Sequence, residues 1–173
     1  MKVVAQRLFD ELGPSGTTGY EVIGTPTSEE EIRALARNNP LQFERWVIGR
    51  LGARPRGYSR ADRGADADLE LPGRLGGGGR ARAVVEVKAR EFRAVDLENL
   101  RLVARLDRAD AGVLVVLTMT GDATQSYGRG EPPLTPEEGS PPPILLVIPA
   151  AELLDEDGAQ RFAAILADAV AHG

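Results

Sequence analysis

Apolar residues recur at helical spacing in several parts of the chain. In "LQFERWVIGRLG" they form one stripe that begins at Phe43, and Gly52 is a typical helix stop. The stretches "VVAQRLFDEL" and "AQRFAAILADAV" show the same kind of spacing. The pattern predicts helices over residues 3–12, over residues 41–51 and at the end of the chain, with Trp46 in the core.

Two further helices are indicated by the residues at their ends. In "TSEEEIRALARNNP", Ser28 and Glu31 form a capping-box pattern, acidic residues crowd the first turn, and Pro40 is expected to stop the helix. Asp96 is expected to cap a helix over about residues 97–108. The apolar face of that helix would consist of Leu97, Leu100, Val103 and Ala104, beside a stripe of Arg101, Arg105 and Arg108.

Strand patterns occupy the middle and the later part of the chain. "ADLEL" alternates with period two, "AVVEVKA" has an apolar centre, and "PGRLGGGG" joins them into a predicted hairpin. The continuous apolar runs "GVLVVLTM" and "PILLVIPA" are typical of strands buried on both faces, and residues 120–142 between them are expected to form a loop. This order of elements predicts an α/β fold of three layers, with a mixed central sheet flanked by helices.

Composition narrows the possible chemistry. A chain of 173 residues, 42% of them hydrophobic, can form one domain with a sizeable core. It has no cysteine, and His172 is its one histidine. These counts exclude disulfides, cysteine-ligated zinc, a serine triad and a two-histidine metal site within one chain. Any chemistry must come from carboxylates, lysine, arginine and hydroxyls.

Two properties bear on partners and location. No apolar run approaches the roughly 20 residues needed to span a bilayer and no signal peptide is recognisable, so we expect a cytoplasmic protein without membrane contact. The net charge is −5, yet residues 50–93 hold 11 of the 21 basic residues and 6 of the 26 acidic ones. This basic middle can attract a polyanion such as DNA, although an arginine-rich composition without a partner explains it too. The candidate DNA contacts are Arg54, Arg56, Arg60, Arg90, Arg101 and Arg105.

One charged pair stands within a strand that otherwise reads as core. Residues two apart on a strand share a face, so Glu86 and Lys88 project together. Asp66 or Asp68 of the neighbouring strand can lie across from them. Paired carboxylates suit a hard cation such as Mg²⁺, and a nearby lysine can hold a water or stabilise developing phosphate charge. The same pattern also fits a solvated strand face.

These residues carry a family resemblance. "GAD" at 64–66 and "EVK" at 86–88 resemble the signature of the PD-(D/E)xK nucleases, in their Mrr-like restriction endonuclease branch. The upstream "GTPTSEEEIRALARNNPLQFERWVIGRLGA" is similar to the segment preceding such domains fused to bacterial DNA methyltransferases. The resemblance implies a restriction-endonuclease-like fold and favours Asp66 over Asp68 as the metal ligand. It also implies that Glu44, in "QFERW", completes the metal site.

The function implied is a restriction or defence endodeoxyribonuclease that uses Mg²⁺, with Mn²⁺ as a substitute. Asp66, Glu86 and Lys88 would be catalytic, and Asp66, Glu86 and Glu44 would hold the metal. Residues 1–40 would form a helical arm and residues 41–173 the nuclease domain, with DNA, a methyltransferase and a second copy of the chain as candidate partners. The alternatives are a DNA-binding or interaction module without cleavage, a branched-DNA resolvase or transposon-end nuclease, and a plain scaffold.

Overall fold

A computed structural model describes most of the chain. The described residues are 25–57, 64–71, 80–119, 143–155 and 157–172. Four sequence expectations lie outside them: the helix over residues 3–12, the glycine-rich hairpin tip, the loop over 120–142 and the placement of Arg60.

The helices and strands predicted within the described residues are present, and two short elements were missed. The helices are α2 (Glu29–Asn38), α3 (Pro40–Leu51), α4 (Ala94–Leu106), the 3₁₀ helix η1 (Ala150–Leu153) and α6 (Gly158–His172). The strands are β1 (Arg54–Pro55), β2 (Ala67–Glu70), β3 (Arg82–Glu91), β4 (Ala111–Thr118) and β5 (Ile144–Pro149). The missed elements are β1 and η1.

Local capping explains where the first two helices begin and end. The Ser28 hydroxyl accepts a hydrogen bond from the Glu31 amide at 3.2 Å, as the capping box predicts. The Asn39 side chain accepts from the Gln42 amide at 3.1 Å, so the next helix starts at once. Pro40 is therefore the first residue of α3, besides ending α2.

Five strands form one mixed sheet in the order β1-β2-β3-β4-β5 among the described residues. The pairs β1–β2 and β2–β3 are antiparallel, which confirms the hairpin. The pairs β3–β4 and β4–β5 are parallel, and α4 connects β3 to β4. The motifs "GAD" and "EVK" thus lie at the antiparallel pair β2–β3, and the most apolar strands, β4 and β5, belong to the parallel half.

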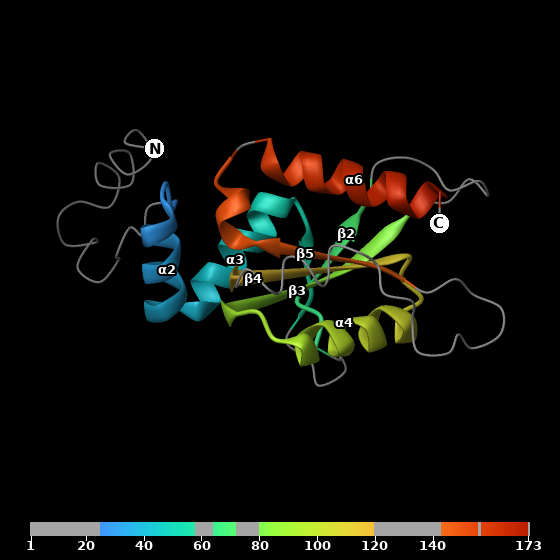
Figure 1. Cartoon of the computed structure of the whole chain (residues 1–173), viewed down its shortest axis with the longest axis horizontal. Helices are drawn as coiled ribbons and strands as arrows, with labels where there is room; N and C mark the ends of the chain where they lie inside the picture. Colours follow the sequence, from blue (N-terminus) through green and yellow to red (C-terminus); the bar gives the residue numbers. More distant parts are fainter. Residues whose placement is uncertain (1–24, 58–63, 72–79, 120–142, 156, 173) are drawn as a thin grey trace.

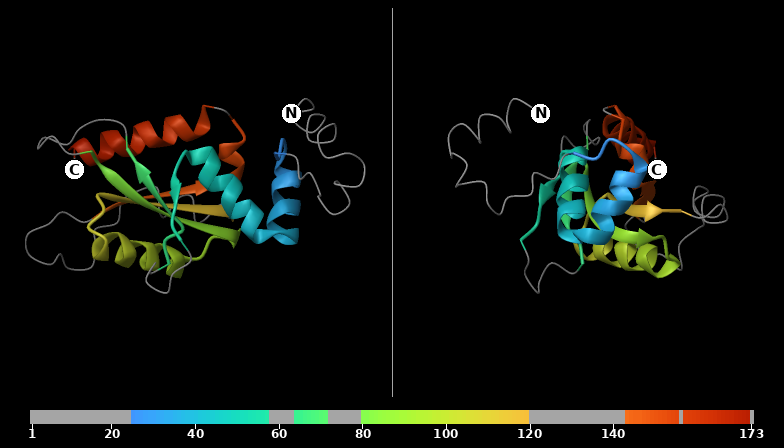
Figure 2. Two further views of the ribbon diagram at one scale, coloured as in Figure 1. Left: turned by 180° about the vertical axis from the view of Figure 1, so that it is seen from behind. Right: turned by 90° about the vertical axis from the view of Figure 1, so that its left-hand side faces the viewer.

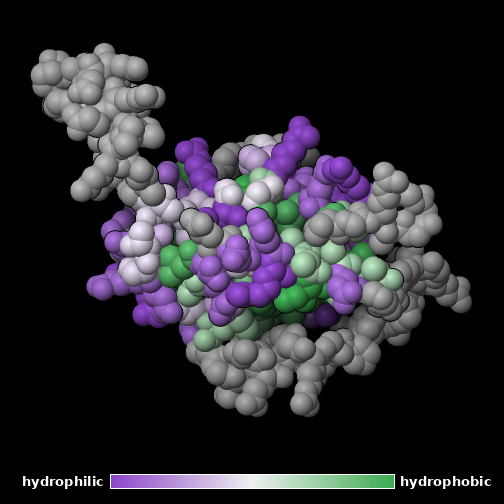
Figure 3. Space-filling view, turned by 90° about the horizontal axis from the view of Figure 1, so that it is seen from above, coloured by the Kyte–Doolittle hydropathy of each residue, from purple (hydrophilic) through white to green (hydrophobic). Residues whose placement is uncertain are grey.

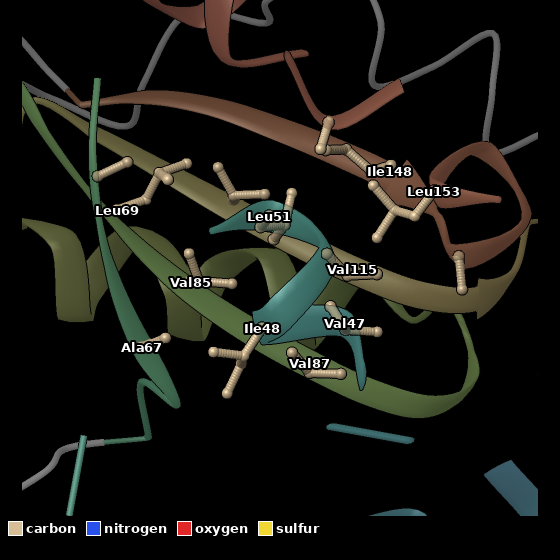
Figure 4. Packing of buried hydrophobic residues seen from close by; sticks show 14 of the residues in the cluster. Val47, Ile48, Leu51, Ala67, Leu69, Val85, Val87, Val115, Ile148 and Leu153 are labelled. Atoms are coloured by element: carbon tan, nitrogen blue, oxygen red, sulfur yellow. The ribbon is translucent and has the colours of Figure 1, made fainter. Parts of the chain in front are cut away.

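Helices cover both faces of this sheet, so the three-layer α/β fold is confirmed (Figures 1 and 2). One face packs against α2, α3, η1 and α6, where side chains such as Val47, Ile48 and Leu153 meet Val85 and Val115 of the strands (Figure 4). The other face packs against α4. Figure 3 views the molecule from the α6 side, where hydrophobic surface lies between polar side chains.

The helices of the first layer join one core. Ile32, Leu35 and Ala36 of α2 belong to the same buried cluster as α3 and the sheet, so this part of the predicted N-terminal arm packs onto the rest of the described chain. Trp46 packs against the core while partly exposed, with its ring centroid 6.1 Å from that of Phe43.

The start of α4 differs from the sequence expectation. The helix begins at Ala94, with Arg93 at its N-cap and no capping side chain, and it ends at Leu106. Asp96 therefore lies in the first turn and is not the cap. The predicted apolar face of α4 is confirmed, since all four of its residues are buried.

In the described part of the chain, no helix combines the length and the apolar character that crossing a membrane requires.

Candidate active site

The β2–β3 hairpin brings Asp66 next to Glu86. In this hairpin Ala67 pairs with Val85. At the end of the hairpin away from Asp66, the Leu71 amide donates to the Ala81 carbonyl at 2.9 Å. Just before β2, the Asp66 amide donates to the Val85 carbonyl at 2.8 Å. The Asp66 carboxylate then accepts from the Val87 amide at 2.7 Å, in place of a backbone acceptor. Both bonds fix the carboxylate beside the centre of β3.

Alternation along β3 sends its charged residues to the α4 side of the sheet. Val85 and Val87 pack into the core shared with α3 and α6, whereas Val84 packs into the α4-side core, as expected for period two. Glu86 projects to the same side as Val84, and its residue is 4% exposed. The buried strand face thus holds a carboxylate in a largely apolar layer.

Lys88 compensates the charge of that carboxylate. Its Nζ lies 2.5 Å from Glu86 Oε1, and the side chains of Lys88 and Glu86 are 27% and 6% exposed. The other oxygen, Glu86 Oε2, is buried and has no hydrogen-bond partner. A buried carboxylate oxygen without a donor is costly, because its desolvation is not compensated. One oxygen of Glu86 is therefore occupied by lysine, and the other is available to a cation.

The electrostatics of the two carboxylates reflect this crowding. Burial, foremost, and the Glu44 carboxylate raise the pKa of Asp66 to about 6, against the Val87 hydrogen bond and the Lys88 charge. Burial also raises the pKa of Glu86, while Lys88 lowers it. Raised pKa values at adjacent acids are typical of sites that await a positive charge, although structural networks show them too.

Glu44 lies in the middle of α3, and its charge acts on Asp66. It is half-buried, and it is the carboxylate with the strongest like-charge effect on the pKa of Asp66. Among the described residues, however, no three or more acidic or histidine side chains are gathered closely enough to hold a metal ion. The predicted set of Asp66, Glu86 and Glu44 is therefore not preassembled, since three carboxylates repel one another unless a cation lies between them.

The residues present nevertheless fit a hard divalent cation. Asp66 and Glu86 offer two carboxylates on adjacent strands, and Glu86 Oε2 has no other partner. Mg²⁺ is commonly held by one or two carboxylates together with several waters. Asp66 and Glu86 would therefore suffice for such an ion, with Glu44 nearby.

Asp68, the alternative metal ligand, is committed elsewhere. The Arg56 guanidinium donates to both of its oxygens, at 2.5 and 2.9 Å, and to Asp107 at 2.6 Å. These hydrogen bonds lower the pKa of Asp68 and raise that of Arg56. Because Asp68 is neutralised by arginine, the geometry favours Asp66 as the acid of the site.

A second ion pair, which the sequence did not indicate, is close enough to Glu86 to affect its pKa. Arg90 forms a bidentate pair with Asp96, at 2.6 and 2.8 Å, and the Asp96 side chain is 3% exposed. The Asp96 charge raises the pKa of Glu86, and the Arg90 charge lowers it. The period-two sequence 86, 88, 90 indicated that Arg90 shares the site's face, but nothing local indicated its partner on α4.

The arginines proposed as DNA contacts do not form one free patch. Arg56, Arg90 and Arg101 are paired with carboxylates, the last with Glu98 at 2.8 Å. Arg54 and Arg105 are exposed and make no side-chain ion pair or hydrogen bond within the described part of the chain. Phosphate binding by the paired arginines would have to compete with these carboxylates.

Comparison with known proteins returns no relative: no family model matches the chain, and no curated protein or solved structure matches it.

Proposed function

We propose that this chain is an endodeoxyribonuclease that depends on Mg²⁺ or Mn²⁺ and serves restriction or defence. The observation that carries the proposal is the ion pair of the buried Glu86 with the half-buried Lys88, with Asp66 directly before the adjacent strand β2. A strand that needed only stability would place apolar residues there, because a buried ion pair contributes little to stability compared with well-packed hydrophobic side chains.

Each residue has a distinct role in the proposed reaction. Asp66 and Glu86 would hold the divalent cation, which supplies a Lewis acid and an activated water. Lys88, which pairs with Glu86 Oε1, would hold the attacking water and stabilise charge that develops on the phosphate. Glu44 would orient water in the outer part of the site. The proposal also includes that the chain binds DNA and that it acts in the cytoplasm.

The proposal is tested by cleavage of plasmid, methylated and branched DNA with Mg²⁺, with Mn²⁺ and with chelator. Lys88→Ala should lower the cleavage rate by about 10²–10³-fold, the typical cost of one preorganised stabilising group, and change DNA affinity little. Asp66→Ala should also abolish cleavage. The matched control is Arg80→Ala, which removes a positive charge from an exposed pair with Glu70 on the same hairpin and should leave the rate unchanged.

The choice among substrates separates the related enzymatic roles. Cleavage restricted to branched DNA would favour a resolvase or transposon-end nuclease over a restriction enzyme. Cleavage governed by methylation would favour cooperation with a DNA methyltransferase.

A DNA-binding or interaction module without cleavage is the second candidate. It is favoured by the absence, among the described residues, of a preassembled group of three metal-binding side chains. Wild-type protein that binds DNA yet leaves every substrate uncut with both metals would establish this reading in place of the nuclease. Failure to bind DNA at low salt would leave a scaffold.

A further inference from the structure

The outer face of α4 carries an exposed apolar stripe. Val95 and Leu102 are each 57% exposed and Leu106 is 52% exposed. They are three of the five large hydrophobic residues exposed in the described part of the chain, and all three lie on one helix. Single exposed apolar residues are ordinary, but an aligned set marks an interaction surface.

The spacing of this stripe matches a helix–helix seam. Val95, Asn99, Leu102 and Leu106 follow one another at intervals of four, three and four residues, the a/d pattern of a two-helix contact. Asn99 is exposed as well, so the seam contains one polar position. The opposite face of α4 is the one that packs on the sheet. The stripe therefore has no partner within the described chain.

The charges beside the stripe complement an identical helix in the antiparallel direction. Glu98 and Arg105 are both exposed and lie seven residues apart, which places them on the same flank of the helix. Glu98 also pairs with Arg101 of its own helix at 2.8 Å, and its side chain remains 54% exposed. Rotation of a second α4 by 180° would bring Glu98 against Arg105 of the partner subunit, and the pair would occur twice. In a parallel arrangement these flanks would lie on opposite sides of the seam, so Glu98 and Arg105 could not pair across it.

We propose that α4 is a self-association surface, on which two copies of this chain pack antiparallel about a two-fold axis. Val95 then meets Leu106 of the partner subunit, and Asn99 meets Leu102 of the partner subunit. An isologous contact of this kind is closed, so it yields a dimer and not a fibre. The inference goes beyond the proposed function and does not depend on it.

The size of the contact predicts its strength. A helix of 13 residues is about 20 Å long, so one helix pair buries less than the roughly 1,200 Å² of standard interfaces. The dimer should therefore be weak and reversible, with a dissociation constant in the micromolar range.

Sedimentation velocity over a range of concentrations tests the surface. Wild-type protein should shift from monomer to dimer as its concentration rises, and Leu102→Glu should remain monomeric. The matched control is Ile165→Glu on α6, which replaces an apolar residue of similar exposure, 51%, on the opposite layer; it should dimerise like the wild type. A wild type that is monomeric at every concentration, or a dimer that Leu102→Glu leaves intact, would overturn the proposal.

Charge reversal and cross-linking test the orientation. Arg105→Glu should weaken dimerisation by about threefold to tenfold, as expected for two exposed ion pairs, and adding Glu98→Arg should restore it. Because the chain has no cysteine, Val95→Cys and Leu106→Cys can be mixed and treated with a short bis-maleimide. In the antiparallel pair residue 95 faces residue 106 of the other copy, while each position is offset from its own copy by about 16 Å along the helix axis. Cross-links between the two variants support antiparallel packing, whereas efficient cross-linking of each variant with itself would overturn it.

Discussion

Asp66 ionises where water has little access, and its pKa of about 6 reflects foremost that burial and then the Glu44 charge. The ordinary pKa of an aspartate is 3.8, so the unfolded chain loses this proton at lower pH than the folded one. The stability that Asp66 contributes is full below about pH 4 and is lost as pH rises through about 6. A shift of this size corresponds to a loss on the order of 3 kcal/mol.

We expect Asp66→Asn to be more stable than the wild type at pH 7.5, because it removes the buried charge and keeps an oxygen for the Val87 amide. The difference should be on the order of 3 kcal/mol and should vanish near pH 4. Urea denaturation in metal-free buffer at several pH values measures it. The control is Asp68→Asn, which should be destabilised at pH 7.5 because arginine lowers the pKa of Asp68. An Asp66→Asn protein less stable than the wild type at pH 7.5 would contradict this account.

The Arg90–Asp96 pair should contribute more than its surface counterpart. Arg90→Ala leaves a carboxylate that is 3% exposed without its partner, and we expect a loss of about 2–4 kcal/mol. Arg101→Ala breaks an exposed helix pair with Glu98 and should cost less than about 1 kcal/mol. Equal losses for the two variants in urea denaturation would show that Asp96 finds other compensation.

At this scale, the sequence predicted what depends on local periodicity. The shared face of Glu86 and Lys88 followed from period two, and the strand pairing placed Asp66 nearby. The pairing of Arg56 with Asp107 spans 51 residues and could not be foreseen. Asp96 was misjudged because an aspartate suits both an N-cap and the first turn of a helix. Its ion pair with Arg90, six residues earlier, accompanies its place in the first turn.

At the scale of elements, prediction succeeded where a period or a cap is present. The helices α2, α3 and α6 and the hairpin were found because each carries several periods or a capping residue. The strand β1 has two residues and η1 has four, so neither is long enough to show a period. The sequence could not show whether α2 forms a separate arm, because that depends on tertiary packing. In the structure α2 shares the core of the domain.

Two glycines on different elements should respond oppositely to alanine. Gly49 lies at an exposed position of α3, and a Cβ added there meets nothing within 4 Å. Gly49→Ala should therefore stabilise the protein by about 0.5–1 kcal/mol. A Cβ at Gly112, in β4, would lie 2.9 Å from Leu100 and from Leu145, so Gly112→Ala should cost about 1–3 kcal/mol. Thermal denaturation measures both. A stabilised Gly112→Ala protein would mean that α4 shifts away from the sheet at little cost.

At the scale of the whole molecule, the acidic net charge and the paired arginines limit DNA binding. The number of neutralised phosphates sets how steeply affinity falls with salt, at about 0.9 per phosphate on a log–log scale. Because Arg56, Arg90 and Arg101 are engaged with carboxylates, we expect a shallow slope for this chain.

This expectation has a simple test. Arg54→Ala should reduce the slope by about one, because Arg54 is exposed and makes no side-chain ion pair or hydrogen bond within the described residues. Arg101→Ala should change the slope less. Fluorescence anisotropy with a labelled duplex at several salt concentrations measures both. A steep slope that neither variant alters would place the DNA elsewhere on the molecule.

The hairpin has a practical consequence for protein engineering. Its two ends are separate: Asp66 and Glu86 lie at one end, and the Leu71–Ala81 hydrogen bond closes the other, five residues away along the strands. That separation is roughly 16 Å at the usual rise of a strand. A tag or reporter domain inserted into the connection between Leu71 and Arg80 would therefore join the chain well away from the carboxylates. This connection is a suitable attachment point for labelling the protein without altering the site.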